Sequence, residues 1–396
     1  MRICILAPYR VIPIMGGASR RVFEMASALA QANVDVVLIH AGSSRRLSRN
    51  LQIIGFRSLE NLIARDTAAA RPFALDTYLS SANPWLASAL VKYLMSKNTD
   101  ILQVEGPWSS FPVAAVLPSL PGNLRLIYDF HNVESETVRQ AGSFPLAWPW
   151  VLFLEREAVR RADLVFCVSE KDRDSISRLH NISQAKVTVV PNGVSKEAFG
   201  MPGVGGDGLR RKLGLPPKSK LVFFHGALGW KPNSDAALAI ARSIAPEFND
   251  DVPGTFFLIA GPNPSRRLLK EAERMRNVSV LGYVANIQEY ISCSDVCIAP
   301  LVGGGGTRLK MLEYLAAGKP IVATFKAAEG LALRDHSECL LFDNLGEGFA
   351  NGIREALSPE VSARLGSSGR VFAERFEWSA IVRSIIPIYD SLLQRS

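Results

Sequence analysis

The stretch PLVGGGGTRLKMLEYLAAGKPIVAT, residues 300–324, carries the strongest information about the fold. Its first residues end the apolar run DVCIAPL, and its last residues form a second apolar run, KPIVATF. Between them lie four consecutive glycines and a segment whose apolar residues recur at helical spacing. A strand, a glycine loop, a helix and a second strand in this order form a βαβ unit, which predicts a parallel sheet.

The glycine loop of this stretch has the composition of a phosphate-binding site. Glycines at 303–306 leave backbone N–H groups open to a ligand, and a helix expected to begin near Thr307 adds partial positive charge. Arg308 and Lys310 in the first helical turn oppose the helix dipole unless an anion lies beside them. The alternative is a loop that is merely flexible. The stretch lacks the Gly-Lys-Ser/Thr ending of a P-loop.

A single acidic residue, Glu313, lies inside the same helical pattern. It follows Thr307 by six residues, which corresponds to roughly 9 Å along a helix. A diphosphate and the ribose hydroxyls of one nucleotide are separated by a similar length. A carboxylate among apolar neighbours needs hydrogen-bond donors, and a ribose diol offers two. We therefore expect Glu313 to bind a ribose; the alternative is a salt bridge with Lys310.

The alternation of strand and helix patterns continues through the chain and predicts an α/β protein with doubly wound parallel sheets. Pro and Gly concentrate without periodicity at 191–208, as in a domain linker. We expect two Rossmann-like domains, 1–190 and 191–377, and a final helix at 378–396 that packs back on the first domain. The expected strands are RICILA (2–7), VDVVLIH (34–40), DILQVEG (100–106), LRLIYDFH (124–131), ADLVFCVS (162–169), KVTVVPNGV (186–194), KLVFFHGAL (220–228), GTFFLIAGP (254–262), VSVLGYV (278–284), DVCIAPL (295–301) and KPIVATF (319–325).

The composition of the 396 residues narrows the function classes. Hydrophobic residues make up 48% and charged residues 21%, as in a packed globular protein. The net charge is +8, but the basic residues are interspersed with acidic ones along the whole chain, and no nucleic-acid-binding module is recognisable. We therefore expect no nucleic-acid partner. The five cysteines suggest buried thiols in a reducing compartment rather than disulfides or a metal site.

The apolar segments predict neither a signal peptide nor a membrane span, so we expect a cytoplasmic protein. The longest apolar run, FPLAWPWVLFL (144–154), contains two prolines. We favour a core or interdomain helix for it. The alternative is an exposed apolar surface for a lipid-linked acceptor or a bilayer.

Several motifs, in order along nearly the whole chain, resemble one family. They are PIMGGASRRVFEMASALAQANVDVVLI (13–39), DFHNVESE (129–136), VVPNGVSKEAF (189–199), GALGWKPNSDA (226–236) and TRLKMLEYLAAGKPIVAT (307–324). Together they resemble the GT-B glycosyltransferases of the "glycosyl transferases group 1" superfamily. The resemblance implies two Rossmann-like domains facing a central cleft. It also implies a retaining transfer of a sugar from a nucleoside-diphosphate-sugar to a hydroxyl acceptor, with no metal or other cofactor.

The resemblance also implies roles for individual residues. Catalytic roles fall to His131, Lys231 and Arg308, with His131 near the reacting centre and the two cations on the diphosphate. The residues implied to bind the donor are Gly16, Gly17, Gly226, Lys231, Gly305, Gly306, Thr307, Arg308, Leu309 and Glu313. The implied acceptor is a saccharide, a lipid-linked molecule or a small molecule in polysaccharide, glycolipid or glycoside synthesis, with peripheral association at the inner membrane face as an option.

Two positions depart from the family pattern. Gly305 stands where the family often has a glutamate that contacts the donor sugar, and Ala227 stands where it often has an arginine. These departures leave two alternatives open: a nucleotide-sugar epimerase or hydrolase, and a non-catalytic nucleotide-sugar-binding subunit. A dinucleotide dehydrogenase is disfavoured because MGGAS lacks the G-x-G-x-x-G spacing.

Four further residues at strand ends or in the following loops are candidates for the site. Glu105 and Asp129 end two of the expected strands and could contact an acceptor; Asp129 could equally satisfy backbone N–H groups. Trp108 could stack on an acceptor, whereas Trp230 could simply pack the wall of the cleft.

Overall fold

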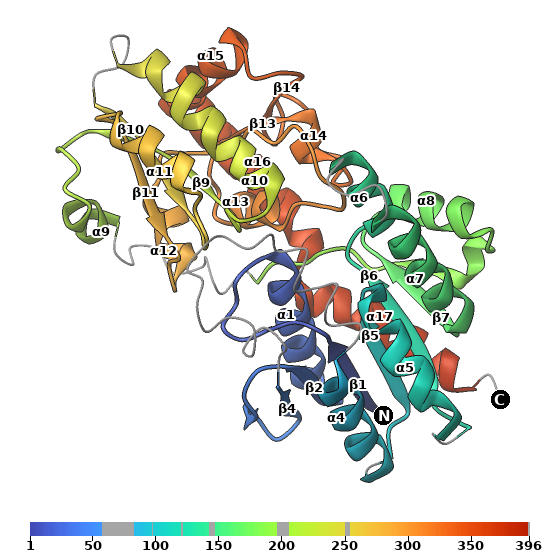
Figure 1. Ribbon diagram of the computed structural model, residues 1–396. Helices are drawn as coiled ribbons and strands as arrows, with labels where there is room; N and C mark the ends of the chain where they lie inside the picture. The colour runs from blue at the N-terminus through green and yellow to red at the C-terminus, as the bar shows by residue number, and fades with distance from the viewer. Residues whose placement is uncertain are drawn as a thin grey trace. The chain divides into compact units, whose positions relative to one another are not determined.

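The computed structural model describes residues 1–57, 83–96, 98–119, 122–141, 147–195, 206–249 and 254–394 (Figure 1). Its contacts divide the chain into two compact units. The N-terminal unit comprises Met1–Gly193, Gly305–Thr307 and Trp378–Ser396, and the C-terminal unit comprises Val194–Gly304 and Arg308–Glu377. The divisions after Gly193 and Glu377 lie close to the expected domain boundaries at 190 and 377. The grouping of Gly305–Thr307 with the N-terminal unit was not expected.

The N-terminal unit is built on an eight-stranded sheet with the order β3-β4-β2-β1-β5-β6-β7-β8, in which only the β3–β4 pair is antiparallel. Its strands are β1 Arg2–Ala7, β2 Asp35–Ala41, β3 Arg45–Arg46, β4 Leu51–Phe56, β5 Ile101–Glu105, β6 Arg125–Phe130, β7 Leu164–Cys167 and β8 Val187–Val189. Its helices are α1 Gly17–Gln31, α4 Pro84–Ser96, α5 Ser110–Val116, α6 Glu134–Ala141, α7 Ala147–Arg161, α8 Glu170–His180 and α17 Trp378–Gln394. Short 3₁₀ turns lie at η1 Pro107–Ser109, η2 Leu117–Ser119 and η3 Gln184–Lys186.

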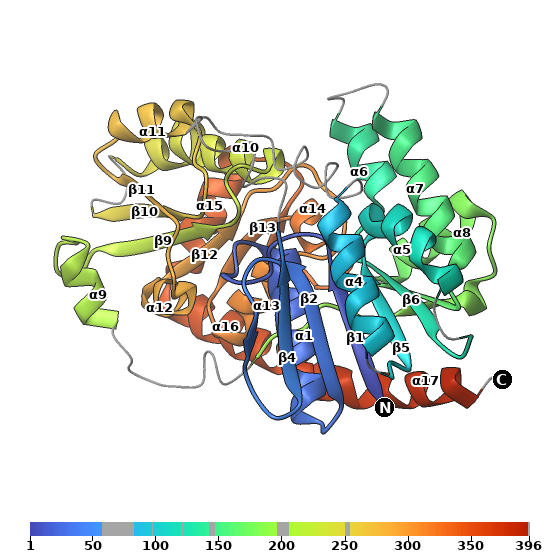
Figure 2. The same ribbon diagram turned by 60° about the horizontal axis from the view of Figure 1, so that its bottom comes forward.

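Both faces of this sheet are covered, which is why its strands read as continuous apolar runs. Ile3 and Ile5 of β1 pack in a cluster with residues of α1 and α17, whereas Cys4 and Leu6 pack in a second cluster with residues of α4, α5 and α7. The helices α1 and α17 lie side by side, although they are more than 340 residues apart in the sequence (Figure 2).

The C-terminal unit has a six-stranded, all-parallel sheet with the order β11-β10-β9-β12-β13-β14. Its strands are β9 Lys220–His225, β10 Thr255–Ala260, β11 Val278–Gly282, β12 Val296–Ala299, β13 Ile321–Thr324 and β14 Leu340–Phe342. Its helices are α9 Gly206–Lys212, α10 Lys231–Ala239, α11 Arg266–Glu273, α12 Ile287–Cys293, α13 Leu309–Ala316, α14 Phe325–Ala328, α15 Glu347–Ala356 and α16 Pro359–Ala373. The helix α10 continues into a π-helical turn, η4 Ile240–Ile244, and 3₁₀ turns lie at η5 Ala245–Phe248 and η6 Glu374–Phe376.

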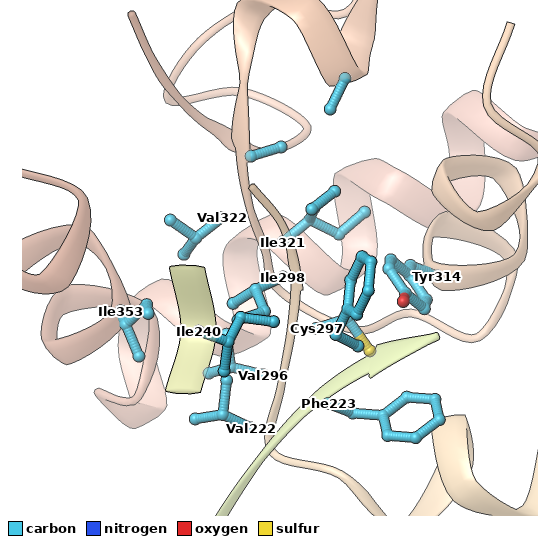
Figure 3. Packing of buried hydrophobic residues seen from close by; sticks show 14 of the residues in the cluster. Val222, Phe223, Ile240, Val296, Cys297, Ile298, Tyr314, Ile321, Val322 and Ile353 are labelled. Carbon is cyan, nitrogen blue, oxygen red and sulfur yellow. The ribbon is translucent and has the colours of Figure 1, made fainter. Parts of the chain in front are cut away.

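The core of this unit lies on both sides of β9 and β12. Figure 3 shows Val222 and Phe223 of β9 with Val296 and Ile298 of β12, and the ring of Tyr314 from α13 beside them. In chain order the six strands are arranged 3-2-1-4-5-6, the strand order of a Rossmann sheet. The strand order reverses between β9 and β12, so the carboxyl ends of these two strands mark the expected ligand position.

The prediction of an α/β fold with two parallel-sheet units is confirmed, and each predicted apolar strand overlaps an observed one. Two local boundaries differ from the predictions. The helix after the glycine loop begins at Leu309 rather than near Thr307, because Arg308 has an extended backbone (φ −92°, ψ 104°). The expected linker at 191–208 overlaps α9, which begins at Gly206; its residues 196–205 lie outside the described part of the chain.

The apolar run at 144–154 contributes both to the core and to an exposed apolar surface, the two alternatives considered for it. Residues 144–146 lie outside the described part of the chain, and the rest forms the first half of α7. Val151 and Leu154 are fully buried, as expected for a core helix, while Trp150 and Phe153 are exposed. Among the described residues, none of the helices combines the length and the hydrophobicity that crossing a membrane requires.

Candidate functional site

In the C-terminal unit, the reversal point of the sheet is formed by bare backbone. Gly261 follows β10 with φ +150°, and a Cβ there would lie 1.7 Å from the carbonyl oxygen of Gly226, which follows β9. A Cβ on Gly226 would lie 2.7 Å from Asn233 Nδ2 and 2.8 Å from Lys310 Nζ. Gly261 therefore requires glycine, because its close neighbour is backbone, whereas a side chain at Gly226 would displace Asn233 and Lys310.

The side chain of Lys310 lies at the end of β9, although the residue belongs to α13. It is buried, its Nζ donates a hydrogen bond to Asn233 Oδ1 at 2.8 Å, and it lies 4.2 Å from the ring centroid of Phe224. Burial, and secondarily the neighbouring cation Arg308, lowers the pKa of this amine to about 7, while Glu313 opposes the shift. The sequence predicts Lys310 in the first turn of this helix, but the family resemblance assigns it no contact with the donor.

Arg308 lies against the glycine loop that follows β12. The side chain is buried, and its Nη2 donates to the carbonyl oxygen of Gly303 at 3.4 Å. Gly304 has φ +98°, and a Cβ there would lie 2.7 Å from Trp230 Cη2 and 3.2 Å from Arg308 Nη2. The loop, the guanidinium and the indole are therefore closely packed, which agrees with the expectation that Trp230 packs locally.

Glu313 is buried beside a histidine. Its Oε2 lies 3.2 Å from Nε2 of His225, the last residue of β9. The backbone N–H of His225 donates to the hydroxyl of Tyr314 at 3.2 Å. The alternative partner considered above, Lys310, donates to Asn233 instead. His225 was not identified from the sequence, although it ends a strand just as His131 follows one.

Two further predicted donor residues begin helices beside this cluster. Lys231 is the first residue of α10; its exposed Nζ lies 2.6 Å from Asp235, one turn along the same helix. Leu309 is the first residue of α13 and is buried. The C-terminal unit therefore brings together Gly226, Arg308, Leu309 and Glu313, with Lys231 at the exposed start of α10.

The N-terminal unit has its own polar cluster at the carboxyl ends of β5 and β6. Glu105 and Asp129 are register partners on these strands, and His131 Nε2 lies 2.7 Å from Glu105 Oε2. Burial, and secondarily the charge of Asp129, raises the pKa of Glu105, while the hydrogen bond from His131 opposes the shift. His131 itself is partly exposed. Both acidic residues thus lie at the carboxyl edge of the sheet, and contact with an acceptor stays a prediction.

Among the described residues, this cluster is the one group whose side chains could hold a metal ion. Glu105, Asp129 and His131 each offer one ligand atom, and these three atoms lie within 4.8 Å of one another. Asp129, however, is fully buried and receives hydrogen bonds from Nε and Nη2 of Arg21, both at 3.1 Å. A guanidinium already compensates this carboxylate, so the arrangement suits a buried ion pair better than a cation site. Arg21 was not identified from the sequence.

The glycines predicted near the start of α1 are held by Ser19. Ser19 Oγ accepts from the backbone N–H of Met15 and of Gly16, both at 3.1 Å, and donates to Gly16 O at 2.9 Å. The N–H of Gly16 is thus engaged within its own loop in this structure, and Gly17 begins the helix. Donor binding by Gly16 and Gly17 stays a prediction.

Gly305 and Gly306 lie against the segment that follows β6, and Thr307 lies against Asn192, which follows β8. A Cβ on Gly306 (φ +66°) would lie 2.5 Å from the carbonyl oxygen of His131, and a Cβ on Gly305 would lie 2.7 Å from Thr137 Oγ1. Thr307 Oγ1 accepts from Asn192 Nδ2 at 2.6 Å. In this structure Gly305 and Gly306 thus lie beside His131, and Thr307 lies beside Asn192; donor binding by these three residues stays a prediction.

The position of Trp108 contradicts the prediction that this residue could stack on an acceptor. It lies in the turn after β5, but it is buried with Val151 and Leu154 of α7. The indole completes a small apolar cluster and is not available to stack on an acceptor.

Two Rossmann-type sheets, with cations and a carboxylate at the reversal point of one, define the class of the protein as a two-unit α/β fold. Family models extend this result. Glycosyltransferase family 4 matches residues 15–198 and glycosyl transferases group 1 matches residues 219–359. The chain belongs to the GT-B glycosyltransferases of this superfamily.

Individual proteins support the same grouping. A D-inositol 3-phosphate glycosyltransferase from Acidothermus cellulolyticus is 30% identical over 258 residues, which cover 61% of this chain and 56% of that protein. The solved structure of sucrose-phosphate synthase from Thermosynechococcus elongatus is similar with a TM-score of 0.80, 18% identity and full coverage of both chains. Anabaena HepE in complex with UDP-glucose is similar with a TM-score of 0.71 and 17% identity, covering 99% of this chain and 100% of HepE.

The structural similarities concern the fold. The chain spans about half the length of the first curated relatives that it matches, between 53% and 56%.

Proposed function

We propose that this protein is a retaining glycosyltransferase that moves a sugar from a nucleoside-diphosphate-sugar to a hydroxyl acceptor. The observation that carries the proposal is the cluster at the β9–β12 reversal point. Glycine backbone at Gly226 and Gly303–Gly304 lies there beside buried cations, and the Glu313–His225 pair lies on the adjoining helix and strand. Bare backbone and cations suit a pyrophosphate, and a buried carboxylate suits a ribose diol.

In the proposed mechanism, the C-terminal unit stabilises the leaving group. Negative charge develops on the nucleoside diphosphate as the glycosidic bond breaks, and Arg308 and Lys231 compensate it. Lys231 is exposed and paired with Asp235 by a surface ion pair worth at most about 1 kcal/mol, so exchanging Asp235 for a phosphate costs little. The acceptor hydroxyl attacks from the same face of the sugar, and its proton passes to a phosphate oxygen.

The N-terminal unit contributes His131 to this proposal. Its ring is partly exposed at the carboxyl edge of the sheet and is oriented by the hydrogen bond between Nε2 and Glu105. A buried carboxylate that holds one ring nitrogen leaves the other nitrogen for a substrate hydroxyl.

The acceptor is proposed by class alone: a saccharide, a lipid-linked molecule or a small molecule such as the inositol phosphate named for the Acidothermus relative. An exposed aromatic cluster of Phe111, Trp150 and Phe153, with ring centroids 5.3–6.0 Å apart, supports a lipid-linked acceptor or association with a membrane surface. Five buried, unpaired cysteine thiols agree with a cytoplasmic location.

A thermal-shift panel with UDP-, GDP-, ADP- and dTDP-sugars tests the donor class, since a ligand that binds the folded state raises its apparent stability. We expect one base to stabilise the protein clearly. Turnover of that donor is then measured with D-inositol 3-phosphate, with a panel of glycosides and lipid-linked saccharides, and without any acceptor. Turnover without acceptor would identify a hydrolase or epimerase, and binding without any turnover would identify a non-catalytic subunit.

Variants then test the assigned residues. Arg308→Ala and Lys231→Ala should each lower kcat by about 100-fold or more, the usual effect of removing one group that stabilises a developing anion. Lys270→Ala, an exposed lysine on α11, is the matched control. Turnover near wild type in both site variants would contradict the assignment.

A further inference from the structure

Lys310 is a buried lysine in the donor-binding unit, and the fold alone does not require its charge. Its Nζ has one oxygen acceptor among the described residues, Asn233 Oδ1, and otherwise lies over the ring of Phe224. An ammonium group carries three N–H donors, so Asn233 satisfies a third of its capacity. A methionine or leucine would fill the same space without placing a charge in an apolar core.

The position of Nζ indicates what the charge could bind. It would lie 2.8 Å from a Cβ built on Gly226, and therefore reaches the bare backbone at the carboxyl end of β9. This is the strand end where the sequence has Ala227 in place of a cationic side chain. Lys310 thus delivers from α13 a positive charge that β9 and its loop do not supply themselves.

We propose that Lys310 is a pyrophosphate ligand of the donor site, and that its Nζ takes up a proton when a nucleoside diphosphate binds. The inference rests on the proposed function, because it assumes that the C-terminal unit binds a nucleoside diphosphate. It adds a residue and a coupled proton that the family resemblance did not assign.

The proton coupling follows from the surroundings of the amine. In the free protein, burial and the cation of Arg308 hold the pKa of Lys310 near 7, with Glu313 as the opposing charge on the same helix. The other charged or titratable groups of the packed elements are His225 at the end of β9 and the Lys231–Asp235 pair at the start of α10. A pyrophosphate beside Nζ favours the ammonium form and raises its pKa. One proton then passes from solvent to Nζ on binding and returns when the nucleotide leaves.

This coupling predicts a specific pH dependence of affinity. Below about pH 7 the amine of the free protein is already protonated, so Lys310 adds no pH dependence there. Above pH 7, until the pKa of the complex is reached, the affinity should fall by up to about tenfold per pH unit. The window of pH 7–9 also lies above the terminal phosphate pKa of about 6, so the ligand itself changes little.

Isothermal titration calorimetry tests the proposal on the full chain. UDP, GDP, ADP and dTDP are titrated in turn, each beside its own nucleoside, in two buffers of different ionisation enthalpy at pH 7.5 and 8.5. We expect uptake of a substantial fraction of one proton with the diphosphate that binds, and none with its nucleoside. Lys310→Met should abolish this uptake, weaken the diphosphate by at least tenfold and flatten the pH dependence, while Lys270→Met should change none of these.

The outcomes separate the two proposals. If no diphosphate binds the wild-type protein, the proposed function fails, and this inference fails with it. If the wild type binds a diphosphate and Lys310→Met retains its affinity and proton uptake, only the inference is overturned. A second variant, Lys310→Arg, serves if Lys310→Met does not fold. Its permanent cation should keep the diphosphate tightly bound but abolish the proton uptake. Proton uptake unchanged from wild type would again overturn the inference.

Discussion

Replacing Arg21 by alanine should destabilise the N-terminal unit more than any exposed substitution on the same helix. The guanidinium is almost fully buried and uses all five of its N–H donors. Two go to Asp129, one each to the carbonyl oxygens of Val190 and Pro191, and one to Asn192 Oδ1, at 2.9–3.1 Å. One side chain thus joins α1 to the end of β6 and to the segment after β8.

The magnitude follows from what the substitution leaves behind. Asp129 is fully buried, so without Arg21 its carboxylate has no countercharge from that side chain and must stay charged at a cost or become protonated. Breaking a buried ion pair by removing one partner typically costs about 3–5 kcal/mol. For a unit of this size, each kcal/mol shifts the melting temperature by about 2–4 °C, so we expect a decrease of roughly 6–20 °C.

Differential scanning calorimetry at pH 7.5 measures this shift, with Arg20→Ala as the matched control. Arg20 is the preceding residue of α1, and its contact with Glu24 is a partly exposed pair at 3.9 Å, which predicts a loss of at most about 1 kcal/mol. The double variant Arg21→Ala/Asp129→Ala should be less destabilised than the sum of the single variants, since the carboxylate left unpaired is then absent. An Arg21→Ala protein that melts within 2 °C of the Arg20→Ala protein would refute the reasoning.

Three further results are expected. The pKa of Lys310 in the folded state lies near 7, below its usual 10.5, so the unfolded chain binds more protons than the folded one between these pH values. The free energy of unfolding of the unliganded wild type, measured by urea denaturation, should therefore rise by about 1 kcal/mol per pH unit from pH 7 to 9 relative to Lys310→Met. A difference between the two proteins that does not change with pH would contradict this. Gly261→Ala should cost about 3 kcal/mol or more in the same assay because its Cβ would overlap Gly226 O, whereas Gly208→Ala, with open space around it, should cost nothing. Glu105→Gln should lower kcat by about 10- to 100-fold, since a hydrogen bond to a charged group is worth about 1.5–3 kcal/mol, and unchanged turnover would show that this carboxylate does not act through His131.

The strands and most helices were predictable because parallel strands buried on both faces leave an unbroken apolar run. The strand β4, with the sequence LQIIGF, lacks such an unbroken apolar run and was not recognised. The short helices α5 and α6 were also missed, since seven or eight residues carry too little periodicity to distinguish them from a loop. The start of α13 was placed two residues early because backbone dihedrals at a helix boundary depend on tertiary contacts.

The sequence predicted those polar residues of the candidate site whose position follows from the end of a strand. Glu105, Asp129 and Glu313 all lie in polar clusters at or beside the carboxyl ends of parallel strands. The pairings were not predictable: Arg21 resembles any polar residue on an amphipathic helix, and only the fold places it against Asp129. Lys310 resembles an exposed lysine of a first helical turn, and only the close approach of α13 to the end of β9 buries it.

This burial gives a physical account of one departure from the family pattern. An arginine in place of Ala227 would bring its charge from the loop after β9 and would stay protonated at every physiological pH. A lysine that reaches the same strand end from α13 is desolvated and held by a single amide, so its charge responds to the ligand. If Lys310 compensates for Ala227, introducing Ala227→Arg into the Lys310→Met protein should restore nucleotide affinity without restoring proton uptake. Recovery of both together would mean that the proton belongs to a different group, and recovery of neither would mean that the two positions do not share a ligand.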